Sequence, residues 1–169
     1  TGAGTGINVN DGALPTILNN AISNFGVGIS VTANSLSGTE VGGNIYKLNG
    51  TNATAGLVQS FAINLGATDP LFNDPANGRF YLQSLSQAID SSVASLENRS
   101  SIEQVKAAIG LPTSSILAPT LDVNGLRRSD DPLVNTPAGL GQNVFIDRGA
   151  IDRVDFVGPS AVLLNPLDN

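Results

Sequence analysis

The chain has 169 residues, enough for one compact domain with a sizeable core. It contains no Cys, His, Met or Trp, which excludes a zinc site with Cys or His ligands, the usual haem ligands, a Cys nucleophile and a Ser-His-Asp triad. Charged residues make up 13% and apolar residues 41%, and the net charge of −6 argues against nucleic acid or an anionic membrane surface as a partner.

The first 68 residues consist of short apolar runs separated by Gly and Asn. Each run is three to five residues long, is rich in β-branched side chains and alternates between apolar and polar positions, so each predicts a short strand rather than an amphipathic helix. The runs are Gly6–Val9, Thr16–Leu18, Gly28–Val31, Asn44–Tyr46, Gly56–Val58 and Phe61–Leu65.

These runs recur at a nearly constant spacing. Gly6–Val9 and Gly28–Val31 begin 22 residues apart (28 − 6), and Asn20 and Asn44 are 24 apart (44 − 20). Two or three short strands in each repeat of this length are typical of one coil of a parallel β-helix, in which Asn occupies corners because it tolerates left-handed backbone and can hydrogen-bond to a stacked Asn. A β-sandwich with Gly/Asn turns is the alternative.

Charge divides the chain into two parts. Residues 1–68 hold only Asp11, Glu40 and Lys47, and the other 19 charged residues follow from Asp69 onward. We therefore predict β-helix coils over residues 1–68, followed over residues 69–169 by terminal strands and an irregular C-terminal cap.

The second part contains more Pro and more turn signals. Asn77-Gly78 predicts a tight turn into a strand at Arg79–Leu82. Ser100–Glu103 matches a helix capping box and Gly110 provides a stop, so one short helix is predicted near residues 101–109. The overall fold class predicted is all-β.

Five motifs stand out in the second part of the chain: Thr68–Phe72, Asn77–Gln83, Ser86–Asp90, Asp122–Arg127 and Asp147–Asp152. Their combined pattern resembles the C-terminal end of secreted right-handed parallel β-helix proteins of the pectate-lyase-like superfamily, which is common in large bacterial surface proteins. The resemblance covers roughly residues 68–152 and departs from the family at Gln87, where Pro is usual. It implies a right-handed solenoid and an extracellular or cell-surface setting.

Enzymes of that superfamily use clustered acids, often with calcium, together with a Lys or Arg base. The predicted coils offer only Asp11, Glu40 and Lys47, which we interpret as solvated corner charges rather than a catalytic set. We therefore predict a non-enzymatic protein with no catalytic residues.

A calcium loop is one interpretation of Asp122–Gly125 with Asp130 and Asp131. However, Arg127 and Arg128 stand where further oxygen ligands would be needed. A turn at Asn124-Gly125, with Arg127 or Arg128 paired to Asp130 or Asp131, is the better interpretation, so no metal or cofactor is predicted.

The tripeptide Ile-Asp-Arg occurs twice, at residues 146–148 and 151–153. Asp147, Asp152 and Asp155 crowd around Arg148 and Arg153, and we interpret this pattern as an ion-pair ladder that ties a C-terminal strand across an exposed coil end. Three glycosylation sequons, which carry meaning only in a eukaryotic secretory context, begin at Asn49, Asn52 and Asn98.

A solenoid exposes unpaired backbone groups at its ends. The charged second part has the composition of a cap, whereas the first coil begins directly with Gly2–Ile7, so we expect an open upstream edge. The chain is then either the C-terminal piece of a longer solenoid or a subunit that associates head-to-tail with copies of itself. The function expected is a structural module of a bacterial surface or secreted protein. The alternatives are a fragment of a polysaccharide lyase or hydrolase, and a carbohydrate-binding or adhesin module, which the scarcity of aromatic residues disfavours.

Overall fold

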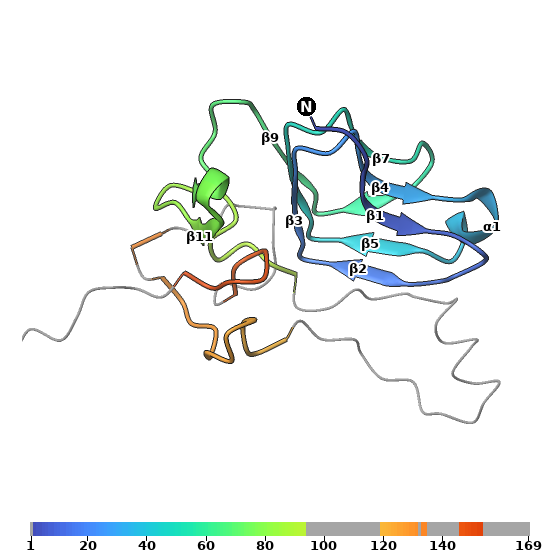
Figure 1. Cartoon of the computed structure of the whole chain (residues 1–169). Coiled ribbons are helices and arrows are strands. Elements are labelled where there is room, and N and C mark those ends of the chain that lie inside the picture. Colours follow the sequence, from blue (N-terminus) through green and yellow to red (C-terminus); the bar gives the residue numbers. More distant parts are fainter. Residues whose placement is uncertain (1, 94–118, 132, 135–145, 154–169) are drawn as a thin grey trace, which may run out of the picture.

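The computed structural model describes residues 2–93, 119–131, 133–134 and 146–153 (Figure 1). Strands dominate the described part, which contains one α-helical turn, α1 (Ala33–Leu36), and one 3-10 turn, η1 (Pro75–Asn77). The helix predicted near residues 101–109 lies outside the described residues. No helix among the described residues has the length and apolar character needed to cross a membrane.

Residues 5–65 form a parallel β-helix of three coils. The strands pair in parallel between coils and make three sheets, ordered β1-β4-β7, β2-β5-β8 and β3-β6-β9. This confirms the predicted solenoid. The strands of the first coil are β1 (Thr5–Val9), β2 (Thr16–Leu18) and β3 (Ala21–Ser23), those of the second β4 (Val27–Val31), β5 (Glu40–Gly42) and β6 (Ile45–Lys47), and those of the third β7 (Thr51–Ala53), β8 (Gln59–Ser60) and β9 (Ile63–Leu65).

The strand register explains the repeat and its limits. Ile7 pairs with Ile29, a spacing of 22 residues, as predicted. In contrast, Ile45 pairs with Ile63, a spacing of only 18 (63 − 45). The second coil is longer because its corner between β4 and β5 holds α1. Sequence periodicity therefore missed β3, β5 and β7, and placed a strand at 56–58 where the structure has a corner before β8.

Left-handed residues form the corners of the coils. The residue directly after β2, β5 and β8 is Asn19, Gly43 and Phe61, with φ of 56°, 62° and 56°. Asn24 follows β3 and also has a positive φ of 65°. The prediction that Asn occupies corners is confirmed at Asn19 and Asn24, whereas Phe61 adopts this backbone without the local side-chain hydrogen bonding that favours Asn there.

The interior of the solenoid is one of two apolar cores. Successive strand residues point to opposite faces, so Ile22 and Tyr46 face inward while their neighbours Ala21 and Ile45 face outward. The buried residues of the interior core are Val9, Ile17, Ile22, Ile29, Val31, Val41, Tyr46 and Leu57.

The second core lies on the outer face of sheet β3-β6-β9. A hairpin formed by β10 (Phe72–Asp74), η1 and β11 (Arg79–Leu82) covers this face together with the turns after it (Figure 1). We expected the cap to cover an end of the solenoid, but its described part lies against the side, because this sheet is apolar on both faces. The buried residues of the second core are Ile45, Ile63, Leu65, Leu71, Leu82, Ala88 and Ile89.

We predict that Ile89→Ala lowers the free energy of unfolding by about 2–5 kcal/mol, because it leaves a cavity in the second core. Ile89 is 0% exposed, whereas Leu85, four residues earlier, is 80% exposed. Leu85→Ala is therefore the matched control, with an expected change within about 0.5 kcal/mol. Urea unfolding of the three proteins checks this, and equal losses in both variants would contradict the proposed packing.

Candidate functional site

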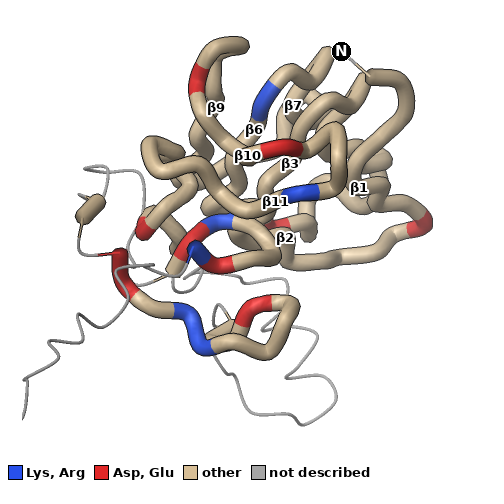
Figure 2. Tube along the Cα trace, turned by 60° about the vertical axis from the view of Figure 1, so that its left-hand side comes forward, with Lys and Arg blue, Asp and Glu red and all other residues tan. Residues whose placement is uncertain are grey.

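Charged residues gather outside the solenoid, on segments that are distant in sequence (Figure 2). The segment ending at Val93 is joined to residues 146–153 by two main-chain hydrogen bonds: Ser92 N donates to Ile146 O at 3.1 Å, and Arg148 N to Ala88 O at 2.8 Å. Segment 119–134 joins through Val123 N, which donates to Ala150 O at 2.8 Å. We call the charged residues that meet here the polar network: Asp90, Asp122, Arg128, Asp131, Asp147, Arg148, Asp152 and Arg153.

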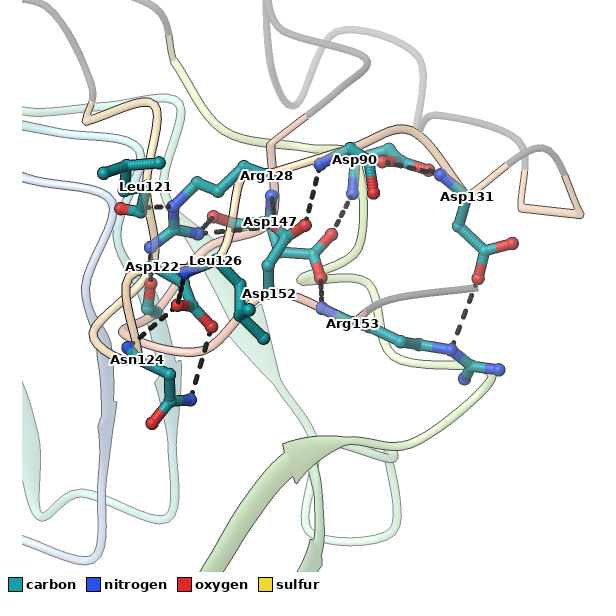
Figure 3. A network of polar contacts seen from close by, with 12 residues as sticks. Asp90, Leu121, Asp122, Asn124, Leu126, Arg128, Asp131, Asp147, Asp152 and Arg153 are labelled. Carbon is teal, nitrogen blue, oxygen red and sulfur yellow. Dashed lines mark hydrogen bonds and ion pairs between the residues drawn. The ribbon is translucent and has the colours of Figure 1, made fainter. Parts of the chain in front are cut away.

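Buried carboxylates of the polar network accept main-chain hydrogen bonds (Figure 3). Asp147 accepts from the N–H groups of Asp90 at 2.9 Å and Arg153 at 2.6 Å. Asp152 accepts from the N–H groups of Ser129 at 2.9 Å and Asp147 at 3.3 Å. Asp147 and Asp152 are each 1% exposed. These acids therefore hold chain segments together.

Two ion pairs join segments far apart in sequence. Arg128 lies 3.5 Å from Asp152, and Arg153 lies 3.3 Å from Asp131. Ion pairs were predicted in both places, but with different partners: the prediction paired Arg128 with its close neighbour Asp130 or Asp131. Sequence proximity was misleading because each of these arginines pairs with an aspartate on a different segment of the chain.

The predicted turn at Asn124-Gly125 is present. Asp122 Oδ1 accepts hydrogen bonds from the N–H groups of Asn124 at 2.8 Å and Leu126 at 2.9 Å, and Gly125 has a φ of 77°. Burial raises the pKa of Asp122, but these hydrogen bonds outweigh it and lower the pKa overall. Within the described ranges, no three acidic side chains converge as they would around a metal ion. Arg127 is exposed, and Asp155 lies outside the described residues.

Arg148 is a fully buried cation of the polar network. Its side chain is 0% exposed and donates from Nε to Ser91 O at 2.9 Å. Its Nη1 donates to Asn44 O at 3.1 Å and Phe61 O at 2.7 Å, which belong to the second and third coils. Burial lowers the pKa of Arg148 to about 10, so the guanidinium stays charged at neutral pH.

Arg148 lies where a ladder of asparagines ends. Asn44 Oδ1 accepts from Asn20 N at 2.8 Å, and its Nδ2 donates to Ile17 O at 3.1 Å, which ties the second coil to the first. The register that pairs Ile45 with Ile63 places Ala62 at the equivalent position of the third coil, where no side-chain amide is available. The Arg148 guanidinium supplies hydrogen bonds at this corner instead.

A second asparagine makes the equivalent contacts with main-chain groups at the corner between β6 and β7. Asn49 Oδ1 accepts from Phe25 N at 2.9 Å, and its Nδ2 donates to Ile22 O at 3.0 Å. Asn19, at the corner after β2, donates from Nδ2 to Val93 O and accepts at Oδ1 from Val93 N, each at 2.8 Å. Sequence analysis noted the 24-residue asparagine spacing but missed the contacts of Asn19 and Arg148, which depend on tertiary structure.

The remaining predicted candidates do not form a site. No hydrogen bond or ion pair within the described part of the chain joins Asp11, Glu40 and Lys47 to one another. The side chain of the sequon residue Asn52 donates to Asn64 at 2.6 Å, and Asn98 lies outside the described residues.

An open groove of about 710 Å³ lies between the corner after β3 and the hairpin. Phe25, Phe72, Phe80 and Ile151 contribute to its lining, and the Phe72 and Phe80 rings pack edge to face with centroids 5.4 Å apart. Sequence analysis missed this grouping because these residues come from three separate segments.

We predict that stability falls as pH rises from about 4 to about 7. Burial raises the pKa of Asp90 and of Asp147 from 3.8 to about 7, and the charge of Asp147 adds to the effect on Asp90. In this window the folded chain keeps protons that the unfolded chain releases, so the free energy of unfolding decreases with pH and levels off above about 7. Asp122, with its lowered pKa, contributes only below the window.

Urea midpoints measured across this pH range test the prediction. Asp147→Asn removes one titrating group and should flatten the profile, whereas the same change at the exposed Asp11 should leave it unaltered. A wild-type midpoint that rises with pH through the window would contradict the assignment.

We also predict that Arg148→Met lowers the free energy of unfolding by roughly 3 kcal/mol or more, because it leaves buried carbonyls without a charged donor. Arg127→Met is the control, since Arg127 is exposed. Thermal and urea unfolding compare the two variants, and a similar loss in both would show that the buried guanidinium has no special role.

We compared the chain with protein-family models, curated proteins and solved structures. No protein-family model, curated protein or solved structure matches the chain. The three stacked parallel sheets establish a short parallel β-helix on their own, without identifying a family.

Proposed function

We propose that this chain is a non-enzymatic structural module of a bacterial cell-surface or secreted solenoid protein. The observation that carries the proposal is the use of the charged residues. Asp147, Arg148 and Asp152 are buried and engaged with main-chain groups, where they join the second part of the chain to the coils. The cellular setting rests on the resemblance of residues 68–152 to secreted β-helix proteins.

The enzymatic alternative has less support. A polysaccharide hydrolase needs two carboxyl groups that face a substrate groove. The acids with raised pKa values, Asp90, Asp147 and Asp152, are 0%, 1% and 1% exposed. The groove of about 710 Å³ has no acidic residue among its described lining residues. A second groove beside the hairpin has one, Asp74, and a smaller one has Asp122 and Asp147, whose carboxylates accept main-chain hydrogen bonds. We therefore favour a structural role over catalysis.

The open coil edges support head-to-tail assembly. Strands β1, β2 and β3 form one edge of their sheets, and β7, β8 and β9 form the other. At this corner the second coil reaches back to the first through Asn44, which contacts Asn20 N and Ile17 O. Asn20 holds the equivalent position in the first coil, so it would reach back to the third coil of a second copy.

The register specifies the partners of Asn20 in that assembly. Ile45 pairs with Ile63 and Val41 pairs with Gln59, so the groups equivalent to Asn20 N and Ile17 O are the N–H of Ala62 and the carbonyl of Gln59. Asn20 Oδ1 would accept from the former. Its Nδ2 already donates to Leu18 O at 3.1 Å and to Asn44 Oδ1 at 3.0 Å, which holds the side chain in place. Such a contact does not close on itself and produces linear particles.

Assembly predicts concentration-dependent linear particles in sedimentation and negative-stain imaging. Asn20→Ala should shift the population toward monomer, because it removes the amide at the interface. Asn10→Ala, at an exposed corner of the same coil, is the control and should behave like wild type. Circular dichroism checks that both variants fold. A wild-type protein that stays monomeric at every concentration would contradict the assembly.

A further inference from the structure

A lysine contacts one peptide bond at the junction between the coils and the second part. Lys47, at the end of β6, is half-buried, and its Nζ donates to the main-chain carbonyl oxygen of Asp69 at 2.5 Å. The bond that follows this carbonyl joins Asp69 to Pro70. A positive charge beside a carbonyl oxygen makes the carbonyl carbon more electrophilic. It also stabilises the negative charge that develops on the oxygen when a nucleophile adds to the carbon.

The nucleophile is available in the same residue. The side-chain carboxyl of Asp69 can reach its own main-chain carbonyl carbon by closing a five-membered ring, a step favoured by proximity. Asp69 Oδ2 accepts from Gly66 N at 2.8 Å, and no hydrogen bond from the described residues occupies Oδ1. The leaving group is the nitrogen of Pro70, a tertiary amide nitrogen that takes up one proton and departs as a secondary amine.

We propose that Asp69–Pro70 is a self-cleavage site and that Lys47 both activates the bond and captures the product. In the first step, a carboxyl oxygen of Asp69 bonds to the main-chain carbonyl carbon and the bond to Pro70 N breaks. The proton of the carboxyl group passes to Pro70 N. The products are a cyclic aspartic anhydride at residue 69 and a free secondary amine at Pro70.

In the second step the anhydride is opened. The neutral amine of Lys47, having transferred its extra proton to the Pro70 amine, attacks the anhydride. An amide bond forms, one anhydride C–O bond breaks, and a carboxylic acid is released. Water is the competing nucleophile and gives an ordinary C-terminal Asp69. Capture by Lys47 therefore makes the 1–69 fragment one water lighter than the hydrolysed fragment.

The chain contains a second Asp–Pro bond as an internal control. The carboxylate of Asp74, which precedes Pro75, is held by Asn77 Nδ2 at 3.1 Å and 2.9 Å. No lysine among the described residues donates to the Asp74 carbonyl. The two bonds have the same intrinsic chemistry, so a difference in their cleavage rates in the folded chain reports on the surroundings of Asp69. The reaction needs only one copy and is independent of the assembly proposed above.

The experiment follows the purified full chain by intact-mass spectrometry during incubation in mildly acidic buffer, which supplies the proton that the Pro70 nitrogen takes up when it leaves. We expect cleavage after Asp69 to outpace cleavage after Asp74, with a 1–69 fragment one water lighter than the hydrolysed form. Lys47→Met should slow the cleavage by roughly 100-fold or more, the cost of losing one oxyanion donor, and should abolish the lighter fragment. Asp69→Asn should stop cleavage there, whereas Asp74→Asn should not.

Two controls make the outcome decisive. In urea, where the Lys47 contact is lost, both Asp–Pro bonds should be cut at similar rates. Circular dichroism shows whether Lys47→Met remains folded. Lys47→Arg keeps the positive charge but removes the nucleophilic amine, so it should retain cleavage and lose the lighter fragment. Equal rates at the two bonds in the folded wild type, or unchanged cleavage and products in Lys47→Met, would overturn the proposal.

Discussion

The placement of one buried guanidinium connects the parts of this molecule. Arg148 donates to the carbonyls of Asn44 and Phe61 in the coils and to that of Ser91 in the segment beside them. A charge removed from water must be compensated by several well-placed acceptors, so this site requires all three segments to be in register at once. The asparagine ladder ends at the third coil, where the equivalent residue is Ala62, and the Arg148 guanidinium supplies hydrogen bonds at that corner.

A second constraint comes from the sheet β3-β6-β9, which is apolar on both faces. Its inner face belongs to the solenoid core, and its outer face is buried by the hairpin and by Ala88 and Ile89. Burying the outer face brings Asp90 next to Asp147, where desolvation opposes ionisation. Apolar packing and the buried acids are therefore linked: the second core positions the segments, and main-chain hydrogen bonds to the carboxylates fix their register.

This organisation separates two regions with different properties. The side of the solenoid is closed by an apolar core and a polar network, whereas the strands at the two coil edges keep main-chain groups directed outward. Further coils or copies can be added at the coil edges while the packing against the outer face of sheet β3-β6-β9 stays the same. This organisation agrees with the proposed structural role. The contact of Lys47 with Asp69 lies at the junction of the two regions, where a change to one peptide bond would alter the covalent connection between them without removing the packing.

The sequence by itself determined the local and repetitive features. The recurrence of Ile7 at Ile29, with Asn20 matched to Asn44, predicted stacked coils because each coil must present the same strands and corners to its neighbours. Asn77-Gly78 likewise predicted its turn from local backbone preferences. Tertiary structure alone decided that the second part covers a side, that Arg128 pairs with Asp152, and that Arg148 enters the coil corner. These two contacts of Arg128 and Arg148 join residues that are 24 (152 − 128) and 104 positions apart, and their partners depend on how whole segments dock, which no local pattern encodes.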